Sequence, residues 1–160
     1  MIQIRLAQPH EIDWINERYD EVHFMHSKFE KEIIAIAEYD GQKAGLGRLV
    51  TLDDGHLELG GMYVLEAYRR HGIARKIVPF LLDLADEGKI VYCIPFQHLL
   101  SFYEKFGFVP CHDVSNISED LKAKIQWCSE MYALQGYSLL YLPACADMRS
   151  GDGKRASDVL

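Results

Sequence analysis

The spacing of apolar and polar residues predicts a strand and then a helix at the start of the chain. Residues 2–6 alternate between apolar and polar side chains, as is typical of a strand. Pro9 then begins a helix, because Ile12, Ile15 and Tyr19 recur at helical spacing while acidic residues occupy the other faces. This helix is expected to present one apolar face to a core.

Three further strands are predicted before the middle of the chain. A weaker helical pattern over about residues 22–29 precedes them. The strands are expected over residues 33–39, 44–52 and 56–65. Asp40-Gly41 is typical of a hairpin turn between the first two, and an Asp-Asp-Gly sequence separates the last two.

The second half of the chain predicts helices and strands in alternation. A helix follows the turn at Gly72, and Pro79 is expected to kink it because proline removes a backbone hydrogen bond. Residues 89–94 form a short apolar run typical of a strand, and residues 96–106 repeat with helical period. Gly107 is expected to end that helix before another strand.

A longer helix and a last strand are predicted beyond Pro110. Ser118 is typical of a helix N-cap. The apolar residues that follow it at helical spacing are Leu121, Ile125, Cys128, Met131 and Leu134. Gly136 is expected to end this helix, and residues 137–142 are expected to form the final strand.

These elements predict a mixed α/β fold, an α+β mixed sheet in the order β-α-α-β-β-β-α-β-α-β. The helix before the last strand is an insertion in this order. We expect a single domain over residues 1–143 and a polar C-terminal tail over residues 144–160. A length of 160 residues suits one domain with a full core.

Composition and charge narrow the class of protein. A hydrophobic content of 49% is ordinary for a soluble domain, and no apolar run reaches the length of a membrane span. The formal net charge of −7 argues against non-specific binding to nucleic acid. The four cysteines are widely separated, so we expect reduced thiols and no metal site. The start of the chain lacks a signal-peptide pattern, and a cytoplasmic location is expected.

The turn between residues 64 and 75 carries the most specific pattern in the chain. Gly72 and Ala74 have almost no side chain, so another molecule can approach the backbone there. The helix that follows begins with unpaired N–H groups and the positive end of the helix dipole, which together suit a phosphate. Arg69, Arg70 and Arg75 concentrate positive charge at the same turn. The pattern predicts a site for a phosphorylated cofactor, although small residues at a helix start also serve packing alone.

Three pieces of sequence in the same order resemble the GNAT superfamily of acetyl-CoA-dependent N-acetyltransferases. They are Met62-Tyr63-Val64, then Arg69-Arg70-His71-Gly72-Ile73-Ala74, then Phe102-Tyr103-Glu104-Lys105-Phe106-Gly107-Phe108. The resemblance covers about residues 57–109. It implies acetyl-CoA as cosubstrate without a metal, and a primary amine on a small molecule or peptide as acceptor. The implied cofactor-binding residues are Met62, Tyr63, Val64, Arg69, Arg70, His71, Gly72, Ile73, Ala74 and Arg75.

The resemblance also implies how the strand before the turn acts. Gly60-Gly61 is unfavourable in a strand unless the backbone bends or a ligand comes close. In the superfamily this strand carries a bulge and opens a slot for the pantetheine arm. Met62 and Val64 would then pair with that arm through their main chain, and a backbone N–H would stabilise the oxyanion of the tetrahedral intermediate.

Glu58 is the candidate general base. Amine acetylation needs a neutral amine, and an alkyl ammonium with a pKa of about 10.4 must first lose a proton. Glu58 lies on the strand that also holds Gly60, Met62 and Val64, on one face if the alternation is unbroken. It stands eleven residues before Arg69, which resembles the spacing of the catalytic glutamate in the histone-acetylating branch. A solvent-facing strand glutamate is the alternative, and His56 or water could then be the base.

Tyr103 is the candidate general acid. The departing thiolate of coenzyme A needs a proton, and a phenol can supply it across about 2 kcal/mol. The position of Tyr103 in the third piece favours this role over a packing role. Phe96 stands seven residues earlier, where many members of the family have an asparagine, so the side-chain amide contact that the resemblance implies is not expected from this position.

The sequence leaves the acceptor and the assembly open. Residues 11–40 hold nine carboxylates against three cations, which would attract a cationic amine but is also ordinary for solvated helix faces. The helix at 118–134 could cover the acceptor site, form the surface of a homodimer, or only pack.

Two other functions compete with acetyl transfer. A regulator that binds acyl-CoA without turnover would keep the same fold. An oxidoreductase that binds a dinucleotide would need a G-x-G-x-x-G turn, which the chain lacks.

Overall fold

The computed structural model describes residues 1–144, and they form two compact units. Unit 1 comprises Met1–Val50 and Leu59–Leu84. Unit 2 comprises Thr51–Glu58 and the chain from Ala85 onward. The single domain predicted over residues 1–143 stays a prediction, and the predicted tail lies outside the described residues except for Ala144.

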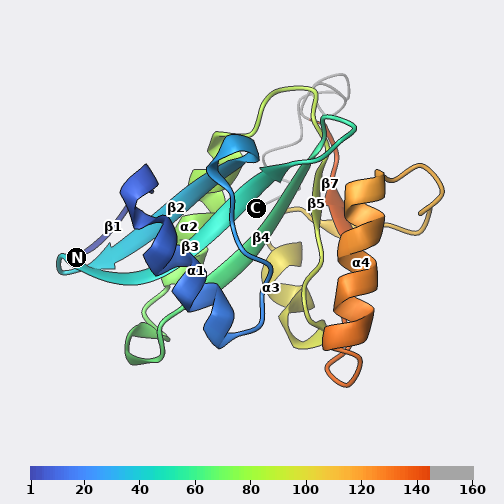
Figure 1. Cartoon of the computed structure of the whole chain (residues 1–160). Helices are drawn as coiled ribbons and strands as arrows, with labels where there is room; N and C mark the ends of the chain where they lie inside the picture. Colours follow the sequence, from blue (N-terminus) through green and yellow to red (C-terminus); the bar gives the residue numbers. More distant parts are fainter. Residues whose placement is uncertain (145–160) are drawn as a thin grey trace. The chain divides into compact units, whose positions relative to one another are not determined.

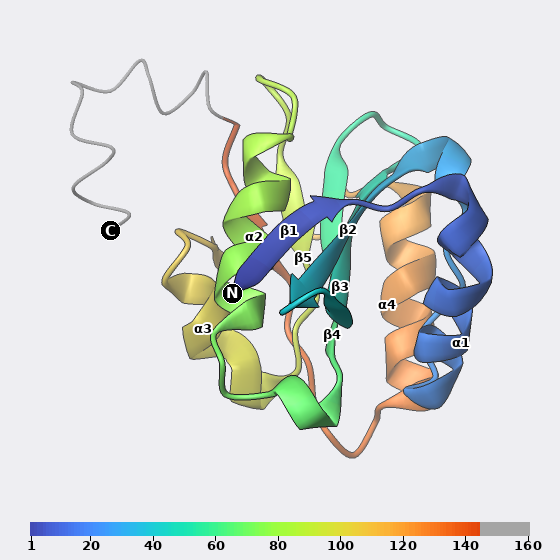
Figure 2. The ribbon, with the colours of Figure 1, turned by 90° about the vertical axis from the view of Figure 1, so that its left-hand side faces the viewer.

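Unit 1 holds an antiparallel sheet between two helices. Its strands are β1 (Ile2–Leu6), β2 (Glu32–Tyr39), β3 (Gln42–Thr51, of which Thr51 belongs to unit 2) and the part of β4 (Leu57–Val64) that follows Glu58. Its helices are α1 (Ile12–Glu21) and α2 (Ile73–Asp83), with short 3₁₀ turns at Pro9–Glu11, Phe29–Lys31 and Glu66–Tyr68. Figure 2 shows α1 and α2 on opposite sides of the sheet.

The hairpin between β2 and β3 confirms the turn predicted at Asp40-Gly41. Both residues have positive φ, 47° and 82°, which is the backbone of a type I′ turn. The strands pair from Tyr39↔Gln42 to Glu32↔Val50, with a register shift at Ala37/Glu38. This turn therefore fixes which residues of β2 and β3 face the same side.

The core of unit 1 follows the predicted helix face. Ile15 and Tyr19 on α1 are fully buried and pack with Ile34 and Leu46 of the sheet. On the other side, a Cβ at Gly47 would lie 2.9 Å from the Ile77 side chain, so this glycine lets α2 approach β3 closely. The residues that recur at helical spacing in the sequence, Ile15 and Tyr19, therefore form the buried face of α1.

The weak helix predicted over residues 22–29 is wrong. After α1 the chain turns at His23, whose φ is +58°, and then runs without regular structure to Lys28. Asn16 explains the difference. Its side chain accepts the Ser27 N–H at 2.7 Å and donates to the Ser27 carbonyl at 3.3 Å, so these backbone groups bond to a side chain instead of a helix.

Unit 2 holds a small antiparallel sheet and two helices. The strands are β5 (Val91–Cys93), β6 (Val109–Pro110) and β7 (Leu140–Leu142), and β7 pairs with both of the others. The helices are α3 (Leu100–Glu104), preceded by a 3₁₀ turn at Gln97–Leu99, and α4 (Glu119–Met131). Figure 1 shows α4 beside β5 and β7.

The packing of unit 2 joins α4 to β5. Leu121 on α4 is fully buried and packs with Tyr92 on β5, Leu52 and Ile117. The start of β4 also belongs here, since the Leu57 N–H donates to the Ile90 carbonyl at 3.0 Å. This strand end carries Glu58.

The predicted N-cap of α4 is confirmed, and its predicted end is wrong. The Ser118 hydroxyl accepts the Leu121 N–H at 3.1 Å. The helix ends at Met131, earlier than Gly136, because Tyr132 already leaves the helical conformation with φ −128° and ψ 29°. The last strand is shorter than predicted and begins at Leu140, although Tyr137 forms an isolated bridge with Phe96.

The hydrogen-bonded strand order is β1-β2-β3-β4-β5-β7-β6. With the four helices, it confirms the mixed α/β fold and the helix inserted before the last strand. Among residues 1–144, none of the helices combines the length and the apolar character that crossing a membrane requires.

Candidate active site

The turn that follows β4 in unit 1 has an unusual backbone. Arg70 and Gly72 have positive φ, 67° and 77°, and α2 begins directly after Gly72. The Arg69 side chain braces the turn by donating to the Val64 carbonyl at 3.0 Å. A Cβ at Gly72 would meet no atom within 4 Å, so the space beside this helix start is open. The left-handed φ favours glycine here, and the open space leaves the first N–H groups of α2 approachable.

The charged side chains of the turn are available to a ligand. Arg69, Arg70 and Arg75 are all exposed. The His71 Nδ1 lies 2.9 Å from the Arg69 carbonyl and 3.1 Å from that of Tyr68, so a proton on Nδ1 would hold the ring against the backbone. The side chain of Ile73 is instead buried, which leaves only its main chain for a ligand.

Gly61 interrupts the regular strand geometry of β4. Its φ is +60°, and its carbonyl accepts the Tyr19 hydroxyl at 2.8 Å. A Cβ at this position would lie 2.8 Å from the Arg48 Nε, too close for any other residue. The unbroken alternation assumed for Glu58, Gly60, Met62 and Val64 therefore stops at Gly61.

The side chains that follow Gly61 pack within unit 1. Tyr63 donates to Glu21 at 2.7 Å, and burial followed by this hydrogen bond raises the pKa of the phenol. The terminal carbon of Met62 lies 2.9 Å from the place that a Cβ at Gly47 would take, so this side chain packs against β3. Both side chains are occupied, which agrees with main-chain roles for these positions, and those roles stay predictions.

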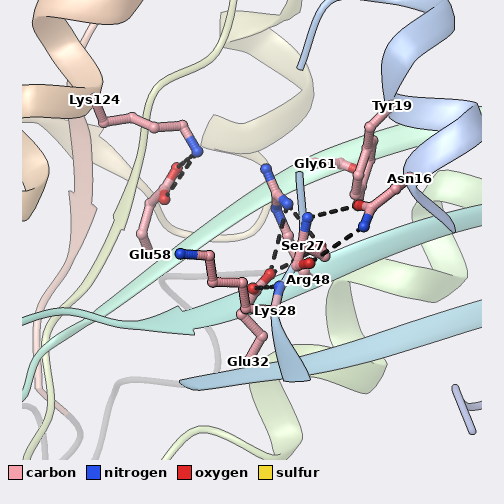
Figure 3. A network of polar contacts seen from close by, with 9 residues as sticks. All are labelled: Asn16, Tyr19, Ser27, Lys28, Glu32, Arg48, Glu58, Gly61 and Lys124. Carbon is pink, nitrogen blue, oxygen red and sulfur yellow. Dashed lines mark hydrogen bonds and ion pairs between the residues drawn. The ribbon is translucent and has the colours of Figure 1, made fainter. Parts of the chain in front are cut away.

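A buried cation lies beside Gly61. Arg48 on β3 is 2% exposed, and its guanidinium lies 4.4 Å from the centre of the Tyr19 ring. Its Nη1 donates to Ser27 at 2.6 Å and lies 3.5 Å from Glu32, while Ser27 donates to Glu32 at 2.9 Å (Figure 3). The Arg48 Nε is buried and has no hydrogen-bond partner among residues 1–144. This network anchors the loop before β2 to the sheet.

Glu58 in unit 2 is a buried carboxylate paired with a lysine. The side chain is 5% exposed, and the Lys124 ammonium lies 3.2 Å from its Oε1 and 3.3 Å from its Oε2 (Figure 3). Lys124 stands on α4 and is 20% exposed. The solvent-facing glutamate considered as an alternative is therefore wrong, because the carboxylate is buried.

The groups that share the surroundings of Glu58 are desolvated. Burial raises the pKa of Tyr103 well above its usual value, and the nearby Cys93 and Glu58 raise it further. Burial likewise raises the pKa of the Cys93 thiol, with Glu58 as the next cause. Cys128 follows the same direction, opposed by the Lys124 charge. Tyr103 is only 5% exposed and stays a protonated phenol at neutral pH.

His56, the alternative base, accepts a hydrogen bond from the backbone. Its Nδ1 accepts the Ile90 N–H at 3.0 Å, so the proton of the neutral ring lies on Nε2.

Sequence reasoning missed Lys124 and Arg48, and both carry a recognisable signal. Lys124 falls at helical spacing from Leu121 and Cys128, so it interrupts the apolar face of α4. Arg48 stands inside an apolar stretch of β3 whose neighbours are buried. A charged residue on a buried stripe requires a partner, which the sequence does not identify.

Residues 1–144 contain no group of three or more histidine, cysteine, aspartate or glutamate side chains that could hold a metal ion.

Solved structures with a similar fold include several acetyltransferases. N-acetylglutamate synthase from Neisseria gonorrhoeae, complexed with coenzyme A and N-acetyl-glutamate, matches with a TM-score of 0.68 at 16% identity. That match covers 90% of this chain and 35% of the synthase, so the chain spans about a third of the synthase's length.

Two smaller proteins match over nearly their whole length. Rv2747 from Mycobacterium tuberculosis, in complex with coenzyme A, matches with a TM-score of 0.63 at 19% identity over 88% of this chain and 98% of its own. The ribosomal-protein-S18-alanine N-acetyltransferase from Escherichia coli matches with a TM-score of 0.62 at 14% identity over 90% and 94%. At these identities the likeness concerns the fold.

Sequence comparison identifies the family. No curated protein matches the chain significantly. The family model described as the acetyltransferase (GNAT) family matches residues 2–108, about two-thirds of the chain. That match includes Glu58, the arginine-rich turn and Tyr103, and it ends before α4. The chain therefore belongs to the acetyltransferase (GNAT) family and has the sequence and fold of an acetyltransferase enzyme.

Proposed function

We propose that this protein transfers an acetyl group from acetyl-CoA to a primary amine by direct transfer in a ternary complex. The observation that carries the proposal is the turn at residues 69–75. It combines an open helix start, a left-handed Gly72 and three exposed arginines in a chain of net charge −7. Such a turn suits the phosphates of coenzyme A.

In this proposal the turn binds the cosubstrate mainly through its backbone. The first N–H groups of α2 receive a phosphate, and Arg69, Arg70 and Arg75 add positive charge around it. The main chain of Met62 and Val64 pairs with the pantetheine arm. Gly61 supports this role because its positive φ bends the strand directly before them.

Glu58 takes the proton of the acceptor. Neutralising an alkyl ammonium at pH 7.4 requires about 4 kcal/mol, and a positioned carboxylate shares that requirement. Burial and a single ionic partner leave the carboxylate of Glu58 with acceptor sites to spare. The neutral amine then attacks the thioester carbonyl, and a backbone N–H of β4 stabilises the oxyanion.

Tyr103 donates the last proton. As the C–S bond breaks, the thiolate of coenzyme A takes the proton of the phenol, and the phenolate takes the second proton that the amine nitrogen loses. The raised pKa keeps Tyr103 protonated until the C–S bond breaks, because burial disfavours the phenolate. The same burial makes the transfer more uphill than from a free phenol, so the reaction depends on placing the thiolate close to the hydroxyl.

The acceptor is proposed as a primary amine on a small molecule or a peptide. The neighbouring N-acetylglutamate synthase and S18-alanine N-acetyltransferase act on different amines, and at 14–16% identity neither selects an acceptor for this chain. A cytoplasmic location and a homodimer also belong to the proposal. Light scattering of the purified chain tests the dimer.

Calorimetric titration with acetyl-CoA tests the turn. We expect micromolar binding for the native chain and none for Gly72→Glu, since a carboxylate there would repel the phosphates. Gly88→Glu is the matched control, because Gly88 has a similar φ of +79° and equally open surroundings outside the turn. Equal loss in both variants would assign the effect to backbone strain and would overturn the phosphate assignment.

A regulator that binds acyl-CoA without turnover is the second candidate. The ion pair between Lys124 and Glu58 favours this candidate, since the Lys124 ammonium already binds the carboxylate that catalysis would use. Tyr103→Phe separates the two: turnover falls only in an enzyme, while binding of coenzyme A persists in both. Tyr92→Phe, which removes another buried phenol of unit 2, is the control.

A further inference from the structure

The ion pair between Lys124 and Glu58 places a primary amine directly against the candidate general base. The ammonium lies 3.2 Å and 3.3 Å from the two carboxylate oxygens. The shorter of these distances is within reach of a direct proton transfer. Lys124 is the only ionic partner of Glu58 among residues 1–144.

This pair differs from the other lysine–carboxylate pairs of the described chain. Lys122 lies two residues before Lys124 on α4. Its ammonium is 3.1 Å from the Glu119 carboxylate, which is 80% exposed. Lys43 lies 3.0 Å from Glu11, whose oxygens also bind Arg5 and a backbone N–H. Only Lys124 combines a buried carboxylate with the absence of any competing donor in residues 1–144.

The contact allows a proton to pass directly from the ammonium to the carboxylate. The transfer leaves a neutral amine beside a carboxylic acid. The thiol of Cys93 and the phenol of Tyr103 lie in the same desolvated surroundings. A neutral amine at this position is nucleophilic.

We propose that Lys124 is a self-acetylation site, at which the chain acetylates its own side chain from acetyl-CoA. This inference rests on the proposed function, because it uses the same cosubstrate and the same base. It goes beyond that function by naming an acceptor built into the chain. The acceptor stands on α4, outside the residues that match the family.

The reaction balances with acetyl-CoA as the only co-reactant. Glu58 takes one proton from the Lys124 ammonium, and the amine nitrogen attacks the thioester carbonyl. The N–C bond forms and the C–S bond breaks, and the thiolate takes a proton from Tyr103. As the tetrahedral intermediate collapses, the amine nitrogen loses its second proton to the phenolate. Glu58 releases the first proton to water, so that the products are N-acetyl-Lys124, coenzyme A and one proton.

Acetylation removes the positive charge of Lys124 and with it the ion pair. Glu58 then has no cation beside it among residues 1–144. Its carboxylate becomes available to the ammonium of an added amine. Self-acetylation would therefore precede transfer to external acceptors.

The test is incubation of the full chain with isotopically labelled acetyl-CoA, followed by peptide mass spectrometry of every lysine. We expect Lys124 to gain one label at a rate that is independent of protein concentration. Lys122 is the internal control, since it is 44% exposed and reports uncatalysed chemical acetylation. Glu58→Gln should lower the Lys124 rate about a hundredfold and leave the Lys122 rate unchanged.

A second variant, Gly72→Glu, tests the inference without changing Glu58, so the result does not depend on whether Glu58→Gln folds. It should abolish labelling of Lys124 without affecting that of Lys122. Labelling of an added amine with Lys124 unmodified would overturn the self-acetylation site and leave the proposed function standing. Absence of acetyl-CoA binding would overturn both. Labelling that rises with protein concentration, or that is equal at both lysines, would also overturn the inference.

Discussion

Two buried glutamates, one in each unit, have opposite surroundings. Glu11 in unit 1 is 4% exposed and receives four donors: the Arg5 Nη1 and Nη2, the Gln8 N–H and the Lys43 ammonium. Glu58 in unit 2 is equally buried and meets one ammonium, shared between its two oxygens. A carboxylate accepts about four hydrogen bonds, so Glu11 is saturated and Glu58 is not.

The difference separates a structural carboxylate from one that is suited to chemistry. The Arg5 hydrogen bonds hold the pKa of Glu11 well below its usual value, with support from Gln8 and Lys43. Such a carboxylate holds its neighbours and takes no proton at neutral pH. Glu58 has free acceptor sites and a single, flexible partner, so another ammonium can replace Lys124.

The largest expected effect is the loss of activity in Glu58→Gln. Acetyl transfer to an added amine should fall about a hundredfold or more at neutral pH, because the variant lacks the proposed base. Alkaline solution should restore part of the rate, since it deprotonates the amine directly. The measurement is kcat/KM from released coenzyme A across a pH series.

Stability should change little in the same variant. We expect a loss of about 1–2 kcal/mol in the free energy of unfolding, because Lys124 can turn to solvent. A full rate at neutral pH would instead assign the base to water.

The reverse pattern is expected for Glu11→Gln. Removing this charge leaves Arg5 and Lys43 without their shared partner and should destabilise the fold by about 3 kcal/mol. That is the low end for a buried pair, because Arg5 and Lys43 are 35% and 32% exposed and water partly replaces the carboxylate. Urea unfolding measures the loss, and the folded variant should keep native kcat/KM. A smaller loss than in Glu58→Gln would contradict the contrast drawn between the two glutamates.

The sequence predicts most of unit 1 because its elements depend on local patterns. Alternation predicts β1, helical spacing predicts α1, and Asp40-Gly41 predicts the hairpin. The helix predicted near residues 22–28 is wrong because Asn16, eleven residues before Ser27, binds the backbone of that segment, and the helical spacing of its apolar residues does not reveal this contact. The arginine-rich turn could be predicted as well, since a site built from backbone leaves glycines at fixed positions.

Only some residues of the candidate site of unit 2 could be predicted from the sequence. Glu58 and Tyr103 follow from spacing and from the family resemblance, and their roles stay predictions. Lys124 lies 66 residues from Glu58 along the chain, and no local pattern joins them. The same holds for Glu11 in the turn before α1, whose partner Lys43 lies on β3. Buried charges need partners, and the fold alone decides which ones meet.

The contribution of Glu11 to the unfolding free energy should depend on pH. Because the pKa of Glu11 is lower in the folded chain than its usual 4.5, the folded state binds fewer protons than the unfolded state. Its contribution to stability is complete above pH 4.5 and is lost as the pH falls toward the folded pKa. The native chain and Glu11→Gln should therefore converge in unfolding free energy as the pH falls below 4.5, when measured by urea unfolding. A constant difference down to low pH would show that Glu11 stabilises the fold by packing and not by charge.

The smallest expected effect concerns the helix that carries the cation paired with Glu58. The cations of Glu11 stand on β1 and β3, whereas the cation of Glu58 stands on α4, whose first turn depends on Ser118. Ser118→Ala should cost about 1 kcal/mol, because the Leu121 N–H loses its cap. Ser129→Ala, an exposed serine on the same helix, should change stability by less than about 0.5 kcal/mol. Hydrogen exchange should quicken along α4 only in Ser118→Ala, with no change in β1. Equal exchange in both variants would show that packing of Leu121, and not the cap, holds the helix that carries Lys124.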